Sequence, residues 1–163
     1  MKINVQQIEG EIGGHQDFSL QTSIDDIFSE ETPWLHNLIA VKGKIVNSGK
    51  YLEVRGIINA TGRFQCHRCL ELFNQTMEIP FCEKYTKQSE ADPAADVFYY
   101  QNDEIDLNEL IRENMLLAVP LKSLCREDCR GLCPLCGCNL NREKCSCEQH
   151  TIDPRLAILK HLK

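Results

Sequence analysis

The sequence predicts an α+β fold: an antiparallel β-sheet or partly open barrel covered by one helix, followed by a C-terminal cysteine-rich module with a short terminal helix. Three observations support this prediction, namely β-branched runs separated by turn residues, one amphipathic helical stretch, and ten cysteines among 163 residues. A chain of this length holds about one ordinary domain and a small appendage. We expect a β-rich domain over residues 1–121 and a cysteine-rich module over residues 122–163.

The β-rich part has the pattern of an antiparallel meander. Two β-branched runs, 38–46 and 51–58, flank the turn residues 47–49, which end in a glycine and are typical of a hairpin. The run 72–79 alternates apolar and polar side chains and is expected to pair with the second strand. Further short strands are expected at 3–5, 18–22 and 97–100, and a mobile acidic loop at 87–96.

One longer helix is predicted over residues 106–118. Asp106 and Glu109 have the spacing of a capping box at its start, and Pro120 ends it. Its mostly apolar stripe, suited to cover one face of the sheet, consists of Leu107, Leu110, Ile111, Asn114 and Ala118. A short terminal helix is predicted after Asp153 and Pro154, which have the residue types of an N-cap and a first turn.

The sequence composition indicates the cellular compartment of the chain. No apolar run approaches the ~20 residues that span a bilayer, and the first residues lack the apolar block of a secretory signal. We therefore expect a cytoplasmic protein without a membrane partner. In a reducing compartment, ten cysteines indicate metal binding or redox chemistry instead of a disulfide framework.

Eight of the cysteines form close pairs with the spacing of tetrahedral Cys₄ zinc sites. The predicted metal ligands are Cys66, Cys69, Cys125, Cys129, Cys133, Cys136, Cys145 and Cys147. The local partition joins the pair 133/136 to the pair 145/147 and encloses a short segment. The remaining four would form a long-range site between the hairpin tip that carries 66 and 69 and the segment after the helix. Two zinc ions are therefore expected.

Some cysteines allow a role other than metal binding. His67 and Arg68, between Cys66 and Cys69, would lower a thiol pKa, as in a thioredoxin-like redox motif. Such redox motifs begin a helix, however, whereas this one lies between two predicted strands. Cys82, alone in a strand, is predicted to be a small buried side chain. Cys138 either substitutes as a ligand or stays free.

The predicted sites do not indicate an enzyme. Four thiolates saturate a tetrahedral zinc ion and leave no coordination position for water or substrate, so such sites are structural. The sequence contains no phosphate-binding loop, dinucleotide glycine signature or nucleophile elbow. We expect neither catalysis nor a small-molecule substrate.

The charge is unevenly distributed. Residues 1–121 hold 10 Lys and Arg against 19 Asp and Glu (net −9), and residues 122–163 hold 8 against 5 (net +3), within a formal total of −6. Nonspecific binding to nucleic acid requires clustered basic residues. Each zinc ion bound by four thiolates is itself dianionic, which brings the tail to neutral or slightly negative. A basic-tail argument for RNA binding is therefore weak.

Several motifs together resemble one protein family. They are Cys66-His67-Arg68-Cys69-Leu70, the segment 124–137 with Gly131-Leu132-Cys133-Pro134-Leu135-Cys136-Gly137, Asn139-Leu140-Asn141, Cys145-Ser146-Cys147 and Asp153-Pro154-Arg155-Leu156-Ala157. The chain resembles the YceD family of large ribosomal RNA subunit accumulation proteins over nearly its whole length. Cys138 departs from the family motif, which has a small uncharged residue there, and this leaves the ligand set of the second zinc open.

The resemblance implies a bacterial cytoplasmic, non-enzymatic factor for large-subunit ribosomal RNA accumulation. Its partner would be the pre-ribosomal large-subunit particle, contacted through ribosomal RNA or a ribosomal protein. A thiol-based redox or stress-sensing zinc protein and a generic protein-interaction module remain as alternatives. The candidate partner-binding side chains are Arg126, Arg130, Arg142, Lys144 and Arg155. Alternatively, these cations offset the thiolate charge of the zinc centres.

Overall fold

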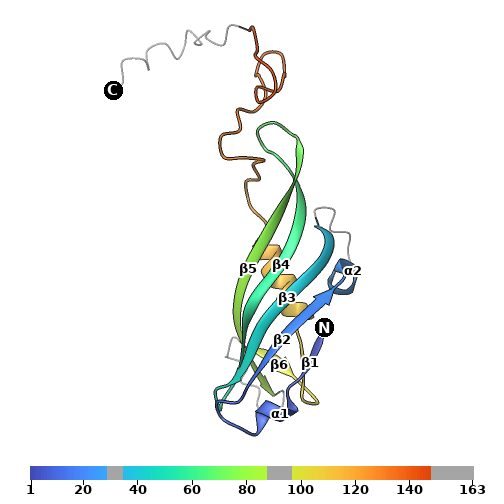
Figure 1. Cartoon of the computed structure of the whole chain (residues 1–163), viewed down its shortest axis with the longest axis vertical. Coiled ribbons are helices and arrows are strands. Elements are labelled where there is room, and N and C mark those ends of the chain that lie inside the picture. Colours follow the sequence, from blue (N-terminus) through green and yellow to red (C-terminus); the bar gives the residue numbers. More distant parts are fainter. Residues whose placement is uncertain (29–34, 88–96, 148–163) are drawn as a thin grey trace, which may run out of the picture. The chain divides into compact units, whose positions relative to one another are not determined.

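The computed structural model describes the backbone of residues 1–28, 35–87 and 97–147 (Figure 1). The chain divides into two compact units. The sheet unit comprises Met1–Phe64 and Phe73–Leu121, and the cysteine unit comprises Gln65–Leu72 and Lys122–Lys163. The hairpin tip thus folds with the cysteine-rich segment. The predicted terminal helix after Asp153 and residues 88–96 of the predicted loop lie outside the described residues.

The sheet unit is built on a five-stranded sheet of order β2-β3-β4-β5-β6. Its strands are β2 (His15–Thr22), β3 (Leu35–Asn47), β4 (Leu52–Gln65), β5 (Leu72–Lys87) and β6 (Phe98–Tyr100). β2, β3 and β4 pair antiparallel, as the predicted meander requires, while β6 adds parallel to the end of β5. The α+β fold class with an open, mostly antiparallel sheet is therefore confirmed.

The remaining elements are a two-stranded sheet and three helices. They are β1 (Lys2–Asn4), β7 (Glu104–Asp106), α1 (Gln6–Glu9), α2 (Ile24–Ile27) and α3 (Asn108–Leu117). α1, α2 and β7, each of three or four residues, were not predicted from the sequence. No helix in the described part of the chain is long and apolar enough to cross a membrane.

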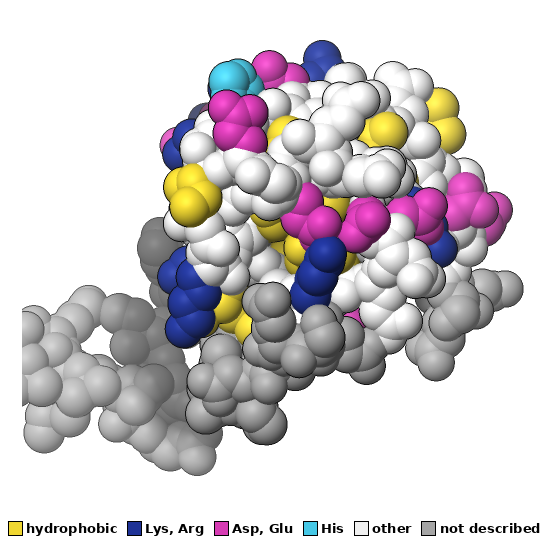
Figure 2. All heavy atoms as spheres, turned by 90° about the horizontal axis from the view of Figure 1, so that it is seen from below, with side chains coloured by type: hydrophobic (Ala, Val, Ile, Leu, Met, Phe, Trp, Pro, Cys, Tyr) yellow, Lys and Arg dark blue, Asp and Glu magenta, His cyan; other side chains and the backbone are white. Residues whose placement is uncertain are grey.

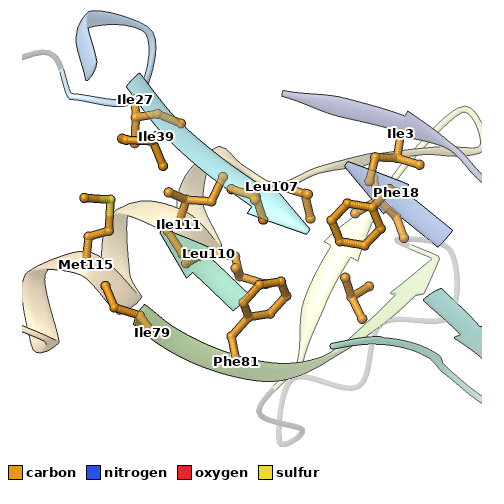
Figure 3. Packing of buried hydrophobic residues seen from close by; sticks show 14 of the residues in the cluster. Ile3, Phe18, Ile27, Ile39, Ile79, Phe81, Leu107, Leu110, Ile111 and Met115 are labelled. Carbon is orange, nitrogen blue, oxygen red and sulfur yellow. The ribbon is translucent and has the colours of Figure 1, made fainter. Parts of the chain in front are cut away.

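Helix α3 covers one face of the sheet, as predicted (Figures 1 and 3). Leu107, Leu110 and Ile111 of the predicted stripe are fully buried against core side chains such as Ile39 and Phe81. Asn114 and Ala118 are only half-buried, and Met115 takes the buried position of the last turn instead. The core therefore lies between α3 and the sheet.

The helix begins two residues later than predicted, and the predicted capping box does not form. Asp106 belongs to β7, where it pairs with Lys2 of β1. Its side-chain Oδ1 accepts a hydrogen bond from the Asn108 N–H at 3.0 Å. Leu107 is the N-cap and makes no side-chain capping bond. Asp106 was expected to open the helix, but the pairing of β7 with β1 holds it in a strand. The spacing of residues in the sequence gives no sign of this pairing.

A pair of glycines lies opposite each other in the middle of the sheet. Gly43 of β3 is the register partner of Gly56 of β4. A Cβ atom at Gly43 would lie 2.7 Å from Cζ of Phe18, and one at Gly56 would lie 2.9 Å from Cζ of Phe81. The absence of side chains therefore lets the two rings pack directly on the backbone of the central strands.

One polar cavity of about 290 Å³ lies at the end of the sheet unit near α1. Charged groups at this end bind one another, because Lys87 Nζ lies 2.8 Å from the Glu9 carboxylate and 3.3 Å from that of Asp103. The Tyr100 hydroxyl donates to Glu9 at 2.6 Å. Figure 2 views the molecule from below and shows acidic and basic side chains side by side around a hollow.

Candidate metal centres

The first cysteine turn closes the hairpin between β4 and β5. The Leu70 N–H donates to the Cys66 carbonyl at 2.9 Å, and the Cys66 N–H donates to the Glu71 carbonyl at 2.9 Å. Leu70 has a φ of 59°, a left-handed conformation that favours glycine. This backbone turns the side chains of Cys66 and Cys69 in the same direction.

The second cysteine turn repeats this backbone pattern. The Gly137 N–H donates to the Cys133 carbonyl at 2.9 Å, and the Cys133 N–H donates to the Cys138 carbonyl at 2.8 Å. Gly137 has a φ of 74° and matches Leu70 of the first turn. Cys138 therefore occupies the position that Glu71 occupies in the first turn, where the backbone carbonyl closes the turn.

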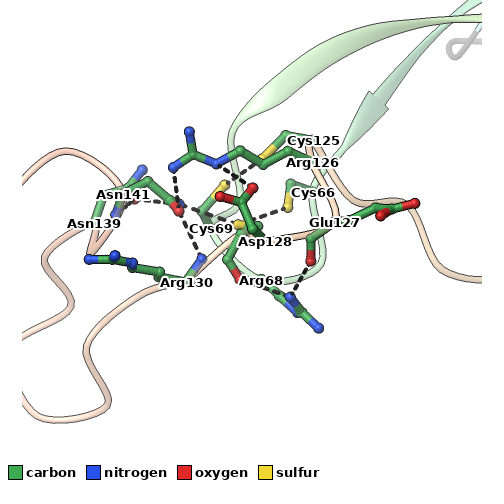
Figure 4. Close-up of polar contacts among 11 residues, drawn as sticks. Cys66, Arg68, Cys69, Cys125, Arg126, Glu127, Asp128, Arg130, Asn139 and Asn141 are labelled. Carbon is green, nitrogen blue, oxygen red and sulfur yellow. Dashed lines mark hydrogen bonds and ion pairs between the residues drawn. The ribbon is translucent and has the colours of Figure 1, made fainter.

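The first cluster joins Cys66 and Cys69 to Cys125 and Cys129. The four sulfur atoms all lie within 4.8 Å of one another, with 3.8 Å from Cys66 to Cys129 and 3.6 Å from Cys69 to Cys125. Three of these cysteines are buried and Cys125 is half-buried. The structure thus brings together the four residues that the sequence assigned to the long-range site (Figure 4).

The second cluster joins Cys133 and Cys136 to Cys145 and Cys147. Its sulfur atoms also lie within 4.8 Å of one another, with 3.4 Å from Cys145 to Cys133 and 3.5 Å from Cys136 to Cys145. Only Cys133 is buried, so this cluster is closer to solvent than the first. Cys138 does not belong to the group of four.

Cys82 is exposed, so the prediction that it is buried was wrong. Neighbouring side chains of a strand point to opposite faces. Phe81 of β5 is 6% exposed and faces the core, which turns Cys82 outward. The apolar residues that precede it, Pro80 and Phe81, did not by themselves show which face of the strand is covered.

The pKa values of the thiols diverge within each cluster. Burial opposes ionisation of Cys66, but backbone N–H groups of Cys125, Cys69 and Arg68 outweigh it and lower the pKa of Cys66 to about 6. Burial and the contact with Cys69 raise the pKa of Cys125 to about 12. In the second cluster, backbone N–H groups of its own turn lower the pKa of Cys133 to about 6. Because neighbouring thiolates repel one another, complete ionisation of a cluster requires a cation.

Both clusters fit a tetrahedral metal ion. A zinc ion at ~2.3 Å from each thiolate places the sulfur atoms roughly 3.8 Å apart, close to the observed separations. Four thiolates fill every coordination position of such an ion, so a metal held here would have a structural role.

The five candidate partner-binding residues differ in their surroundings. Arg126 donates to Asn141 Oδ1 at 2.8 Å and lies 3.4 Å from the Asp128 carboxylate. Arg142 forms an ion pair of 2.6 Å with Glu71. Arg130 and Lys144 are exposed, and within the described residues their side chains make no hydrogen bond or ion pair. Arg155 lies outside the described residues.

Two side chains that support the first cluster were not predicted from the sequence. Arg68 donates to the carbonyls of Glu127 at 3.1 Å and Cys129 at 2.9 Å. Asn141 donates to the sulfur of Cys129 at 3.3 Å. Both residues lie inside the family motifs. Their positions, Arg68 between two predicted ligands and Asn141 in the segment between two others, were the features of the sequence that could have indicated a supporting role.

Comparison with known proteins identifies the family. Residues 54–163 match the family described as Large ribosomal RNA subunit accumulation protein YceD, and this range covers more than half of the chain and both cysteine clusters. The chain belongs to the YceD family. Its resemblance to that family, inferred from the sequence motifs, is therefore confirmed.

Individual relatives agree with the YceD assignment. The Arabidopsis thaliana protein named Large ribosomal RNA subunit accumulation protein YCED homolog 1, chloroplastic, is 24% identical over 155 residues, which are 77% of this chain and 48% of that protein. An uncharacterized protein of Mycobacterium tuberculosis is 31% identical over 110 residues, or 65% of this chain and 53% of that protein. The chain thus spans about half the length of these relatives. No solved structure matches it.

The two clusters predict a metal stoichiometry. We expect about two metal ions per chain, because each group of four sulfur atoms satisfies one tetrahedral ion. Elemental analysis of protein purified without added metal measures this ratio. One ion per chain would restrict binding to a single cluster, and iron with a visible chromophore would contradict zinc as the bound metal.

Proposed function

We propose that this chain is a non-enzymatic factor that supports the accumulation of large-subunit ribosomal RNA, with a cysteine unit held together by two structural zinc ions. The observation that carries the proposal is the YceD match over residues 54–163, a range that includes every cysteine of both clusters. The family's name supports the link to ribosomal RNA, and the sulfur geometry supports the metal.

Zinc is the metal that the ligands favour. All eight ligands are thiolates, and the two turns have the C-x-x-C spacing and backbone pattern of tetrahedral sites. Thiolates held by zinc are not available to cycle with a partner disulfide, which disfavours a redox role. We place the protein in the reducing bacterial cytoplasm, where these thiols would stay free to bind metal.

The experiment that tests this function is complementation of a deletion strain. The ratio of large- to small-subunit ribosomal RNA should fall in the deletion strain and recover with the wild-type chain. The variant Cys66→Ser/Cys129→Ser should fail to restore it, whereas Cys82→Ser, which changes a thiol outside both clusters, should restore it fully. A normal ratio in the deletion strain would exclude the proposed function.

We further propose that the cysteine unit contacts the pre-ribosomal large-subunit particle through ribosomal RNA. Arg130 and Lys144 would make the first contacts with its phosphates. Both side chains are exposed and have no acidic partner within the described residues, so they can reach phosphates without breaking an internal contact. Arg126 and Arg142 would contribute only after leaving Asp128 and Glu71. Arg155 remains part of the proposed set.

The variant Arg130→Gln/Lys144→Gln is expected to weaken association with pre-ribosomal particles and to reduce its salt dependence. Each lost phosphate contact lowers the slope of log affinity against log salt by about one. Co-sedimentation over a salt series measures both effects. The control Lys42→Gln/Arg112→Gln removes the same charge from the sheet unit and should leave association unchanged. If the control weakens association equally, the net charge of the chain and not these two side chains determines binding. If neither variant weakens association, the acidic sheet unit becomes the candidate binding surface and a basic ribosomal protein its candidate partner.

A further inference from the structure

We propose that Asn141 couples the two metal centres, so that a metal ion at either cluster strengthens the binding of the other. The inference rests on the proposed zinc sites and adds a residue that connects them. The linking loop, defined here as residues 137–144, joins Cys136 to Cys145 of the second cluster. From this loop Asn141 reaches the first cluster (Figure 4).

Both polar atoms of the Asn141 side-chain amide form hydrogen bonds. Its Nδ2 donates to the sulfur of Cys129 at 3.3 Å and to Asn139 Oδ1 at 2.9 Å. Its Oδ1 accepts from the Arg130 backbone N–H at 2.8 Å and from the Arg126 guanidinium at 2.8 Å. One of these four bonds stays within the linking loop, one reaches a ligand of the first cluster, and two come from residues beside its ligands.

The orientation of this amide follows from its partners. The backbone N–H of Arg130 and the guanidinium of Arg126 can only donate, so the amide atom that faces them must be the oxygen. The nitrogen therefore faces Cys129 and can only donate to the sulfur. A donor to a thiolate ligand partly neutralises its charge and orients it, and such supporting bonds raise metal affinity.

The linking loop depends on the second cluster for its shape. Its two ends are ligands whose sulfur atoms, in Cys136 and Cys145, lie 3.5 Å apart. Apart from these ends, backbone bonds support the loop. Within it the Arg142 N–H donates to the Asn139 carbonyl at 3.0 Å, and other bonds join it to the preceding segment, including those from the Leu140 N–H to the Gly131 carbonyl at 3.0 Å and from the Cys133 N–H to the Cys138 carbonyl at 2.8 Å. Without a metal to hold the ends, four neighbouring thiol groups do not fix the loop, and Asn141 leaves Cys129.

Coupling of this kind is reciprocal. If a metal at the second cluster raises the affinity of the first, a metal at the first cluster must raise the affinity of the second by the same factor. The physical route is the same bond, because a thiolate fixed by metal in Cys129 is a better acceptor for Asn141 than a mobile thiol. The two ions are then expected to enter and leave together.

The variant Asn141→Asp tests the coupling at one atom. The carboxylate keeps an oxygen for Arg126 and the Arg130 N–H but replaces the donor that faces Cys129 with a negative oxygen. We expect zinc affinity at the first cluster to fall about 10- to 100-fold, the usual effect of losing a supporting bond. Competition with a zinc chelator gives the affinities, and cadmium NMR of the cadmium-loaded protein assigns the change to a cluster. Asn141→Ala, which adds no charge, should change affinity in the same direction.

Native mass spectrometry gives an independent readout of cooperativity. With one equivalent of zinc added to metal-free protein, the wild-type chain should yield mainly chains with two ions and chains with none. Asn141→Asp should instead yield chains with a single ion. The control Arg142→Gln removes an exposed ion pair from the same loop and should leave the wild-type distribution, since such pairs contribute little.

A double-mutant cycle decides whether Asn141 acts through the second cluster. In the background Cys145→Ser/Cys147→Ser, zinc affinity at the first cluster should already be reduced, and Asn141→Asp should reduce it no further. Equal losses in both backgrounds, or single-ion chains in the wild-type titration, would overturn the coupling. A wild-type chain that binds fewer than two ions would overturn the proposed zinc sites themselves, which separates the two failures.

Discussion

Replacing Cys133 by Ser is expected to unfold the part of the cysteine unit that carries the second cluster, while the sheet unit stays folded. Among the described residues, the buried side chains of the cysteine unit are the thiols of Cys66, Cys69, Cys129 and Cys133 and the hydroxyl of Ser123. The apolar core lies entirely in the sheet unit. A structural zinc ion contributes on the order of 10 kcal/mol to a module that has little core of its own.

Amide hydrogen exchange measures the extent of this unfolding. Protection should disappear over residues 131–147, which carry the second cluster, weaken over residues 65–72 and 122–130, and persist in α3 and in the parts of β2 to β5 outside the hairpin tip. The matched control is Cys82→Ser, which changes an exposed thiol of the sheet unit and should alter the free energy of unfolding by less than about 0.5 kcal/mol. Uniform loss of protection along the chain would mean that the two units unfold as one.

The clusters show which part of the site the sequence determines. Spacing alone pairs Cys133 with Cys136, because two residues between ligands and a following glycine fit one tight turn. The long-range cluster followed by elimination, since the local site uses two of the four pairs. In the structure the first turn has the same backbone bonds as the second although Leu70 stands where glycine is favoured. Spacing therefore predicted the grouping of ligands better than residue type did.

Tertiary contacts account for what the sequence did not predict. Asp106 has the spacing of a helix cap, but the pairing of β7 with β1 fixes it before the helix begins. The contact of Asn141 with Cys129 depends on two segments that meet only when the clusters form. Cys82 faces outward because Phe81 takes the core side of β5. For Asp106 and Asn141 a partner distant in sequence selects among locally acceptable arrangements, and for Cys82 the side of β5 that faces the core decides.

The same reasoning applies to the central glycines, where Gly56→Ala is expected to destabilise the sheet unit by roughly 3 kcal/mol, the upper end of overpacking effects. The new Cβ would lie 2.3 Å from the Lys42 carbonyl oxygen and 2.8 Å from Gly43 Cα. Both are backbone atoms of the adjacent strand, so no side-chain rotation relieves the contact. The strands would have to separate, and the ring of Phe81 would have to move with them.

Thermal or denaturant unfolding followed by circular dichroism measures this loss, with Gly10→Ala as the matched control. Gly10 belongs to the same unit, a Cβ at this position would have no atom within 4 Å, and its φ of −78° is one that alanine adopts freely. Gly10→Ala should therefore be neutral or stabilise by up to about 1 kcal/mol. Zinc content of Gly56→Ala should stay at the wild-type value, because the ligands belong to the cysteine unit. Stability of Gly56→Ala equal to that of the control would show that β3 and β4 can accommodate a side chain between them, and the close packing of Phe18 and Phe81 on the glycine pair would then contribute little to the fold.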